Sequence, residues 1–419
     1  MIMERPSLVA LLLASLASLF ILFGDRSGST NYLHSLILHR QHIQEGMSST
    51  GEDHSAFAVD DQGRTGGQNL MTPGSDRIMP TADGRKDVAN QRYTSHSQRH
   101  DLETMDSIET ILGRINHTDP AWATKADCCY TYSEKRSAIS TSLQEKRHCR
   151  KRLPVALVIG VKKCGTGTLS TFLDLHPAVS MTGETRFPRE NATNTSVASW
   201  IQRMRLSSPY QLTMTENPGF FYYNFLLFLK PYLPSSVKFF LLLRDPVDRL
   251  ISDYAHLVAH SNAPKDRPFD IMYRIYRIRD TLEKTILQPD GDIMKSKLIL
   301  QGMYIDRINK FLDVYRKDQL MFIDGDAFAK DPYPTMLEAE RFLGLPKFYK
   351  RSHFVKNDTK GFYCANVPER PDKRCMIPGK GRPHPKVPER FLRKLHDFYR
   401  PYNRALNEQL GLNFSWIFK

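Results

Sequence analysis

The sequence lacks two features that would define common classes of protein: a cysteine pattern for a metal centre and an internal repeat. Only six of its 419 residues are cysteine, and no two of them have the Cys-x-x-Cys spacing of structural zinc sites, so no metal site is predicted. No internal repeat of useful length is present, which excludes a solenoid. Acidic residues are outnumbered too: 45 Asp and Glu against 59 Lys and Arg give a formal net charge of +14. This charge favours a polyanionic partner, and because no nucleic-acid recognition motif is present, an acidic polysaccharide or an anionic membrane is favoured over nucleic acid.

Long hydrophobic runs are also rare, and the one that stands out lies at the N-terminus. Residues 7–24 form an uncharged, largely apolar stretch that ends at Asp25 and Arg26. At about 1.5 Å rise per residue, such a stretch just spans the hydrocarbon core of a bilayer. We expect a signal-anchor transmembrane helix at 7–24 and a cytoplasmic tail at 1–6, which would make this a single-pass type II membrane protein. A cleaved signal peptide is the competing interpretation. Both interpretations place the part of the chain that follows in the lumen.

The segment that follows has the composition of a stem. Residues 25–152 are rich in polar and charged residues and show little apolar periodicity, apart from a short helix expected near Leu102–Ile115, so a largely disordered segment is predicted. Cys128, Cys129 and Cys149 lie close together in this segment, and the sequence leaves their pairing open. As a group, the acceptors for N-glycosylation agree with a lumenal chain; they are Asn116, Asn191, Asn194, Asn357 and Asn413.

The pattern changes at Leu153, and the region 153–419 reads as one folded domain. Short apolar runs alternate there with segments of helical periodicity. The strand-like runs are Val155–Ile159, Leu212–Thr215, Lys238–Leu243 and Leu320–Asp324, and the helical patterns are Thr168–His176, Val247–Val258, Leu298–Tyr315, Pro334–Leu343 and Pro388–Leu410. This alternation predicts an α/β fold with a P-loop-like parallel sheet flanked by helices. Ligands of such sheets gather at the carboxyl ends of the strands.

A glycine-rich turn follows the first of these strands. The segment Gly160-Val-Lys-Lys-Cys-Gly-Thr-Gly167 joins an apolar strand to a helix, an arrangement in which backbone N–H groups and the helix dipole hold phosphate. It is not a Walker A loop, because Thr166 stands where that motif needs lysine. ATP-dependent phosphoryl transfer is therefore disfavoured. Taken alone, the turn could also be an ordinary strand-to-helix connection.

Further motifs make the loop specific. Gly160-Val-Lys-Lys-Cys-Gly-Thr166 resembles the 5′-phosphosulfate loop of sulfotransferases, and Arg244-Asp-Pro-Val-Asp-Arg-Leu-Ile-Ser-Asp-Tyr254 is similar to the segment with which that family binds the 3′-phosphate of its donor. From Leu153 to Lys419 the chain resembles the heparan sulfate glucosaminyl 3-O-sulfotransferases and the sulfotransferase domain of the N-deacetylase/N-sulfotransferases. Other matching segments are Asp324–Asp326, Glu340–Leu343, Lys360–Cys364, Cys375, Lys380–Pro385, Phe398–Asn403 and Phe414–Trp416.

The resemblance implies direct transfer of a sulfuryl group from 3′-phosphoadenylyl sulfate (PAPS) to a sugar hydroxyl of a glycosaminoglycan, without a metal. Lys163 matches the lysine that stabilises charge on the leaving phosphate oxygen, and Glu184 aligns with the catalytic base. The resemblance also implies a disulfide between Cys364 and Cys375. The residues expected to bind the donor are Lys162, Lys163, Cys164, Gly165, Thr166, Gly167, Arg244, Ser252, Lys380, Gly381, Arg382, Pro383 and His384.

The side of the site that would hold the acceptor departs from the family pattern. After the base this chain reads Thr-Arg-Phe-Pro-Arg189, and a Lys-Thr-Pro segment of the family is replaced by Glu216-Asn-Pro. Phe311 stands where an acceptor-side tryptophan is common. We expect Arg186, Arg189, Glu216 and Phe311 to contact the acceptor. The glucosamine 3-O position of heparan sulfate is the first expectation. The alternatives are another position, chondroitin or dermatan as the acceptor, and a catalytically weakened relative that binds heparan-like chains.

Overall fold

The computed structural model describes residues 106–116, 118–119, 121–132, 136–185, 194–221, 229–261, 278–359, 361–368, 375 and 383–419. The apolar run 7–24, expected to be a membrane anchor, lies outside the described residues, as does most of the expected stem. Within the described part of the chain, no helix is both long enough and apolar enough to cross a membrane.

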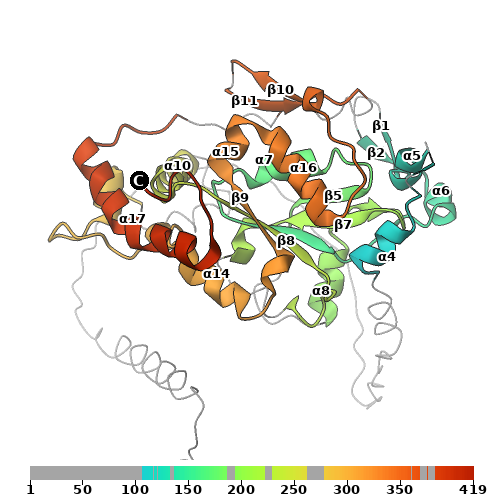
Figure 1. Ribbon diagram of the computed structural model, residues 1–419, viewed down its shortest axis with the longest axis horizontal. Helices are drawn as coiled ribbons and strands as arrows, with labels where there is room; N and C mark the ends of the chain where they lie inside the picture. The colour runs from blue at the N-terminus through green and yellow to red at the C-terminus, as the bar shows by residue number, and fades with distance from the viewer. Residues whose placement is uncertain are drawn as a thin grey trace, which may run out of the picture. The chain divides into compact units, whose positions relative to one another are not determined.

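A five-stranded parallel sheet organises the domain (Figure 1). Its strands are, in spatial order, β5 (Val179–Glu184), β7 (Leu212–Glu216), β4 (Ala156–Gly160), β8 (Lys238–Leu243) and β9 (Leu320–Asp324). All neighbouring pairs are parallel. The chain leaves β4 to build one half of the sheet and later returns to the other side of β4 as β8. The strand order therefore reverses beside β4, and the carboxyl ends there form the crevice in which open α/β sheets bind ligands.

Two of the central sheet strands, β4 and β8, are buried apolar runs, as the sequence predicted. Every residue of β4 is buried, and β8 is buried from Phe239 to Leu243, because helices pack against the sheet. The strand that the sequence did not reveal is β5, which reads Val-Ser-Met-Thr-Gly-Glu and has no continuous apolar run. Its position at the edge of the sheet, paired only with β7, explains the weaker signal.

Helices follow most of the strands. They are α7 (Thr166–Leu173), α8 (Asn194–Ile201), α10 (Pro246–Ser261), α12 (Leu282–Ile286), α13 (Lys297–Leu300), α14 (Tyr304–Leu312), α15 (Gly325–Lys330), α16 (Pro332–Leu343) and α17 (Glu389–Leu410). α7 packs on β4, β5 and β7, and α17 packs on α10 and α14 at one end of the domain (Figure 1). The helix expected over 298–315 is divided in two at Gly302, where a Cβ atom would lie 2.8 Å from the Tyr399 ring.

Ordered structure begins before Leu153, where the domain was expected to start. Residues 106–152 contain α4 (Ile108–Gly113), α5 (Trp122–Ala126), β1 (Tyr130–Tyr132), β2 (Arg136–Ala138), α6 (Thr141–Lys146) and β3 (Arg150–Lys151). β1 pairs with β2, and β3 pairs with β6 (Leu206–Ser207) of the domain. Ile108 and Ile111 are each 3% exposed within the main core. The predicted stem is thus folded from residue 106 onward, because its few apolar side chains are buried against the domain.

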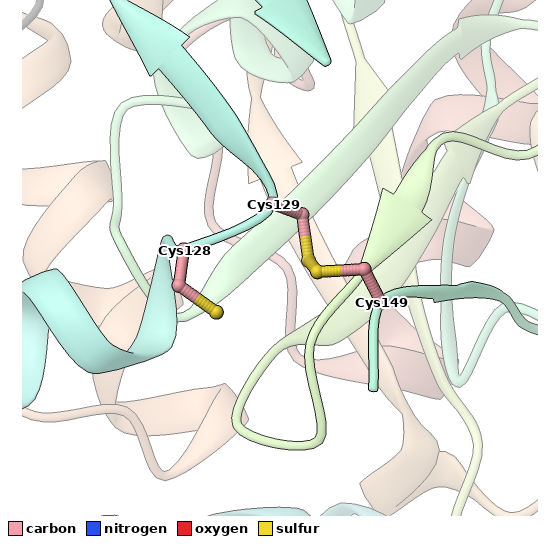
Figure 2. A group of neighbouring side chains, drawn as sticks. All are labelled: Cys128, Cys129 and Cys149. Carbon is pink, nitrogen blue, oxygen red and sulfur yellow. A yellow bond between two sulfur atoms is a disulfide. The ribbon is translucent and has the colours of Figure 1, made fainter. Parts of the chain in front are cut away.

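Two disulfides close short loops. Cys364, in β11 (Phe362–Ala365), is joined to Cys375, the pairing that the resemblance implied. β11 pairs with β10 (Phe354–Asn357). The second disulfide joins Cys129 to Cys149 and settles a pairing that the sequence left open (Figure 2). Cys128 is a free, partly buried cysteine beside it, and burial raises the pKa of its thiol.

Candidate active site

The glycine-rich turn wraps over the carboxyl end of β4. The Val161 N–H donates to the carbonyl of Leu242 in the neighbouring strand at 2.8 Å, and the Cys164 N–H donates to the Val161 carbonyl at 3.1 Å. Lys163 has a φ of 74°, an uncommon left-handed conformation for a residue other than glycine. Such conformations persist where the surrounding structure imposes them, often at active sites. The turn ends at Gly165, with φ 100°, and α7 begins at Thr166 with its first N–H groups directed at the turn.

The turn is supported from below by the start of α15. A Cβ atom on Gly325 would lie 2.6 Å from the Cys164 carbonyl oxygen and 3.0 Å from the Leu243 carbonyl oxygen, so only glycine fits between them. Cys164 itself is 2% exposed, and burial raises the pKa of its thiol to about 12. The thiol therefore stays protonated and is not a nucleophile. Its role is to fill the space under the turn, while the backbone of the turn faces the crevice.

Arg244 lies at the carboxyl end of β8, directly beside the turn. Its Nε donates to Asp326 Oδ1 at 2.8 Å, and its Nη2 lies 4.0 Å from Asp248 Oδ2. Burial opposes the charge of the guanidinium, but the two carboxylates outweigh it and raise the pKa of Arg244. The Tyr304 hydroxyl also donates to the Arg244 carbonyl at 2.8 Å. These contacts fix a permanently charged, planar group whose remaining N–H donors suit a phosphate.

Helix α10 follows Arg244 and carries the other residues of this side. Ser252, one of the residues expected to bind the donor, is partly exposed. Asp253, next to it, is fully buried and lies 2.8 Å from the Lys162 ammonium and 3.1 Å from the Arg249 guanidinium. Burial raises the pKa of the Asp253 carboxyl, but the two cations outweigh this and lower it below its usual range. Sequence reasoning did not identify Asp253 or Arg249, because nothing in a single sequence shows which helix face meets the turn.

Two histidines approach the same crevice. His256, one turn beyond Ser252 in α10, has its pKa lowered to about 3 by burial and by the charges of Lys162 and Lys163. Its ring lies 4.2 Å from that of His260. Burial, Arg244 and Lys163 also lower the pKa of His384. Of the expected donor-binding segment, Pro383 and His384 are described, and Lys380, Gly381 and Arg382 lie outside the described residues.

The expected catalytic base stands at the same edge of the sheet. Glu184 ends β5, is exposed, and is the register partner of Glu216 at the end of β7. The chain after Glu184 is held to β7, because the Asn217 side chain donates to the Thr185 carbonyl at 2.5 Å and the Thr185 and Thr215 hydroxyls lie 2.8 Å apart. Lys163 and Glu184 therefore follow two strands of one sheet, β4 and β5, with β7 between them.

The four residues expected to contact the acceptor differ in their positions and in their exposure. Arg186 and Arg189 lie outside the described residues. Glu216 is at the carboxyl edge of the sheet but only 7% exposed. Phe311 is a correction to the sequence-based expectation: it is 7% exposed and packs edge-to-face on Phe239, with ring centroids 4.9 Å apart, so it belongs to the core and does not face an acceptor. Its sequence position resembled a family site, but the local helix directs it inward.

A metal centre finds no support in the described part of the chain. The one group of potential ligands there consists of Cys128, Cys129 and Cys149, whose sulfur atoms lie within 4.8 Å of one another (Figure 2). Two of these sulfurs are joined to each other as a disulfide. Since thiolates are what bind zinc, this cluster is a covalent crosslink of the N-terminal layer, residues 106–152.

The fold is that of an α/β protein with a parallel sheet, and the groups at this edge of the sheet suit a phosphorylated ligand. The sulfotransferase domain model matches residues 153–407, and the chain belongs to the sulfotransferase family. It is 32% identical over 270 residues to human heparan sulfate glucosamine 3-O-sulfotransferase 6, covering 64% of this chain and 75% of that protein. It is 32% identical over 268 residues to mouse heparan sulfate glucosamine 3-O-sulfotransferase 3B1, covering 64% of this chain and 65% of that protein. A solved sulfotransferase from Alicyclobacillus acidocaldarius aligns with a TM-score of 0.43 at 18% identity, over 63% of this chain and 99% of that one.

Proposed function

We propose that this sulfotransferase moves the sulfuryl group of PAPS onto a hydroxyl of heparan sulfate, at the 3-O position of glucosamine. The observation that carries the proposal is the pairing of the turn after β4 with Arg244 after β8. Adjacent parallel strands thereby present two phosphate-binding elements at one edge, which suits a donor with phosphate groups at two positions. The glucosamine acceptor follows from the names of the relatives.

The residues divide the work of an in-line transfer. The backbone N–H groups of the turn and the start of α7 would hold the 5′ phosphosulfate, and Arg244 with Ser252 would hold the 3′-phosphate. Glu184 would take the proton of the sugar hydroxyl as its oxygen bonds to sulfur. Lys163 would stabilise the negative charge left on the phosphate oxygen as its bond to sulfur breaks. Each of these groups stabilises charge that develops only during transfer.

The test is transfer of labelled sulfate from PAPS by residues 106–419, the part that includes the folded N-terminal layer. Acceptors are heparan sulfate, N-sulfated heparosan, chondroitin and dermatan, followed by disaccharide analysis of the product. We expect label on glucosamine 3-O in heparan chains. Label at another position of heparan sulfate, or label only on chondroitin or dermatan, would keep the sulfotransferase activity and change the proposed acceptor. If no acceptor is labelled and the protein still binds heparin, we would conclude that it is a catalytically weakened relative that binds heparan-like chains.

We further propose that the protein is anchored in the Golgi membrane with its domain in the lumen. The two disulfides support an oxidising compartment. Two of the expected glycosylation acceptors, Asn116 and Asn413, have exposed side chains, and Asn357 is partly exposed; nothing is described of the side chains of Asn191 and Asn194. Protease protection in sealed Golgi vesicles, with glycosidase treatment of the protected fragment, tests both points. Digestion without detergent would contradict a lumenal domain.

A further inference from the structure

The turn after β4 is tied to α10 by a buried charge cluster made of Lys162, Asp253, Arg249 and Gln301, here called the loop clamp. Asp253 is 0% exposed and lies between the Lys162 ammonium, 2.8 Å away, and the Arg249 guanidinium, 3.1 Å away. Arg249, also 0% exposed, donates to Gln301 Oε1 at 3.2 Å and to the Leu298 carbonyl at 2.7 Å. The clamp therefore connects the turn, through α10, to the segment around α13.

The clamp holds the turn at the residue next to the proposed catalytic lysine. Lys162 directly precedes Lys163, whose φ of 74° places it in a conformation that only surrounding contacts maintain. The other contacts on the turn, from Leu242 to Val161 and from Gly325 to Cys164, act on its backbone from the sheet side. The Lys162–Asp253 ion pair fastens the turn to α10. That helix also carries Ser252 and begins just after Arg244, so the ion pair fixes where the turn, and with it Lys163, lies relative to the helix.

The charges around Asp253 favour a role for Lys162 in holding the turn over a role in binding a ligand. A carboxylate buried between two cations keeps its charge, because Lys162 and Arg249 compensate for the lost hydration. An ammonium committed to this carboxylate stays with it when an external phosphate arrives, since leaving would expose a buried negative charge to a single cation.

We propose that Lys162 and Asp253 are a positioning pair, which holds Lys163 in register with Arg244 and Ser252 for sulfuryl transfer. Lys162 acts through Asp253 and is not a donor-phosphate ligand, which replaces the role that sequence resemblance suggested for it. The inference rests on the proposed function, because the lysine that it positions is the one assigned to the leaving phosphate oxygen. A displacement of about 1 Å in a catalytic group can lower a rate by about 100-fold, so a tether of this kind controls turnover more than binding.

The experiment uses the full chain, four single variants and one double variant. Lys162→Met removes the ammonium and keeps the aliphatic chain, Lys162→Arg restores a cation, and Asp253→Asn removes the carboxylate charge at constant size. Lys284→Met is the matched control, because its ion pair with Asp280 is also short, at 2.7 Å, but is solvent-exposed and outside the crevice. For each variant we would measure kcat, the KM for PAPS, the Kd for 3′-phosphoadenosine 5′-phosphate and thermal unfolding.

A positioning pair predicts a split between turnover and binding. Lys162→Met should lower kcat about 10- to 100-fold with the nucleotide Kd little changed, and Lys162→Arg should recover most of the loss. The double variant Lys162→Met with Asp253→Asn should be no slower than the worse single variant, because both substitutions break one interaction. Lys284→Met should match the wild type in every measurement.

Other outcomes overturn the inference. A loss of nucleotide affinity in Lys162→Met, with Asp253→Asn unaffected, would make Lys162 a donor ligand. Additive effects, or a kcat unchanged in Lys162→Met, would also refute the pair. If Asp253→Asn does not fold, the comparison of Lys162→Met with Lys162→Arg decides alone, since both keep the Asp253–Arg249 pair. A wild-type chain that transfers sulfate to no acceptor overturns the proposed function and the positioning role together, whereas an active wild type with unaffected variants overturns the positioning role only.

Discussion

Two buried aspartates in this protein each lie between two basic side chains, and they are found at opposite ends of the sheet. Asp253 lies between Lys162 and Arg249 beside the turn, at the carboxyl edge. Asp174 lies between Arg136 and Arg205, with contacts of 3.0 and 2.9 Å, where the chain leaves α7 to enter β5 at the amino edge.

The partners of each aspartate determine what it does for the protein. Arg136 comes from β2, so Asp174 fastens the N-terminal layer to the domain, and the backbone N–H of Met181 in β5 donates to the same carboxylate at 3.3 Å. Lys162 comes from the proposed donor turn, so Asp253 holds the turn that carries the proposed catalytic lysine. If the proposed positioning role is correct, one arrangement of charges serves stability at one edge and turnover at the other, because ligands of open parallel sheets bind at the carboxyl edge.

The largest expected effect is on chemistry at the carboxyl edge. Lys163→Ala and Glu184→Gln should each lower sulfate transfer by about 10³- to 10⁴-fold, because one removes stabilisation of the leaving oxygen and the other removes the base. The melting temperature should stay near that of the wild type, since Glu184 is exposed. Transfer assays with purified, folded variants check this; retained turnover in both variants would refute the assignment of the pair.

At the amino edge, Asp174→Asn should reduce stability and leave chemistry intact. Removing the charge breaks the buried pair with Arg136, which keeps the more distant carboxylate of Asp127 at 3.6 Å, so a loss of about 3 kcal/mol of unfolding free energy is expected, at the lower end for a broken buried pair. The kcat of the folded fraction should be unchanged. Chemical denaturation gives the stability, and Asp318→Asn, which breaks the exposed pair with Arg316, is the control and should not change it. If Asp174→Asn lowered kcat without lowering stability, the proposed difference in role between the two edges would be wrong.

Removing the disulfide of the N-terminal layer should also lower the stability of the protein. Cys149→Ser opens the crosslink to Cys129 across a separation of 20 residues, for which a loss of about 3 kcal/mol is expected from the freedom gained by the unfolded chain. Cys128→Ser keeps the crosslink and should leave stability nearly unchanged. Denaturation curves with mass mapping of the bridges test the pair of variants, and equal effects of the two would show that the crosslink in solution involves Cys128.

Arg244→Ala should weaken nucleotide binding before it affects folding. The guanidinium would make charge-assisted hydrogen bonds to phosphate worth about 1.5–3 kcal/mol, so the Kd for 3′-phosphoadenosine 5′-phosphate should rise about 10- to 100-fold. Calorimetric titration measures it. Adenosine 5′-phosphate, which lacks the 3′-phosphate, is the matched probe and should bind both proteins alike. An unchanged Kd for the bisphosphate would remove Arg244 from the 3′-phosphate site.

The smallest expected effect is a dependence of stability on pH. The pKa of His256 is about 3 in the folded protein, below the usual value of about 6.5 that applies in the unfolded chain. Between these values the unfolded chain binds the proton and the folded chain does not, so stability is full above about pH 6.5 and falls as the pH is lowered toward the folded pKa. His256→Gln should therefore lose less stability than the wild type between neutral and acidic pH. Parallel loss in both proteins would contradict the depressed pKa.

Much of the sheet and of the donor side could be predicted from the sequence. The apolar runs that became β4 and β8 carry a strong local signal, because strands buried on both faces are hydrophobic throughout. The turn after β4 has a similarly local signal. β5 and the folded part of the N-terminal layer could not be predicted, because their few apolar residues are buried by contacts with segments distant in the chain, such as β7 and β6.

The candidate site divides in the same way. The sequence by itself determined the turn and Arg244, each of which belongs to a short motif after a predicted strand, and it singled out Glu184 without revealing β5, the strand that carries it. Only the tertiary structure decided that Lys162 is held by Asp253, that Phe311 is in the core and that Cys129 is bonded to Cys149. These outcomes depend on which side chains approach one another across the fold and on how much water is excluded around them. A charge or a thiol has the same identity everywhere in the sequence, but its partner and its burial exist only once the chain is packed.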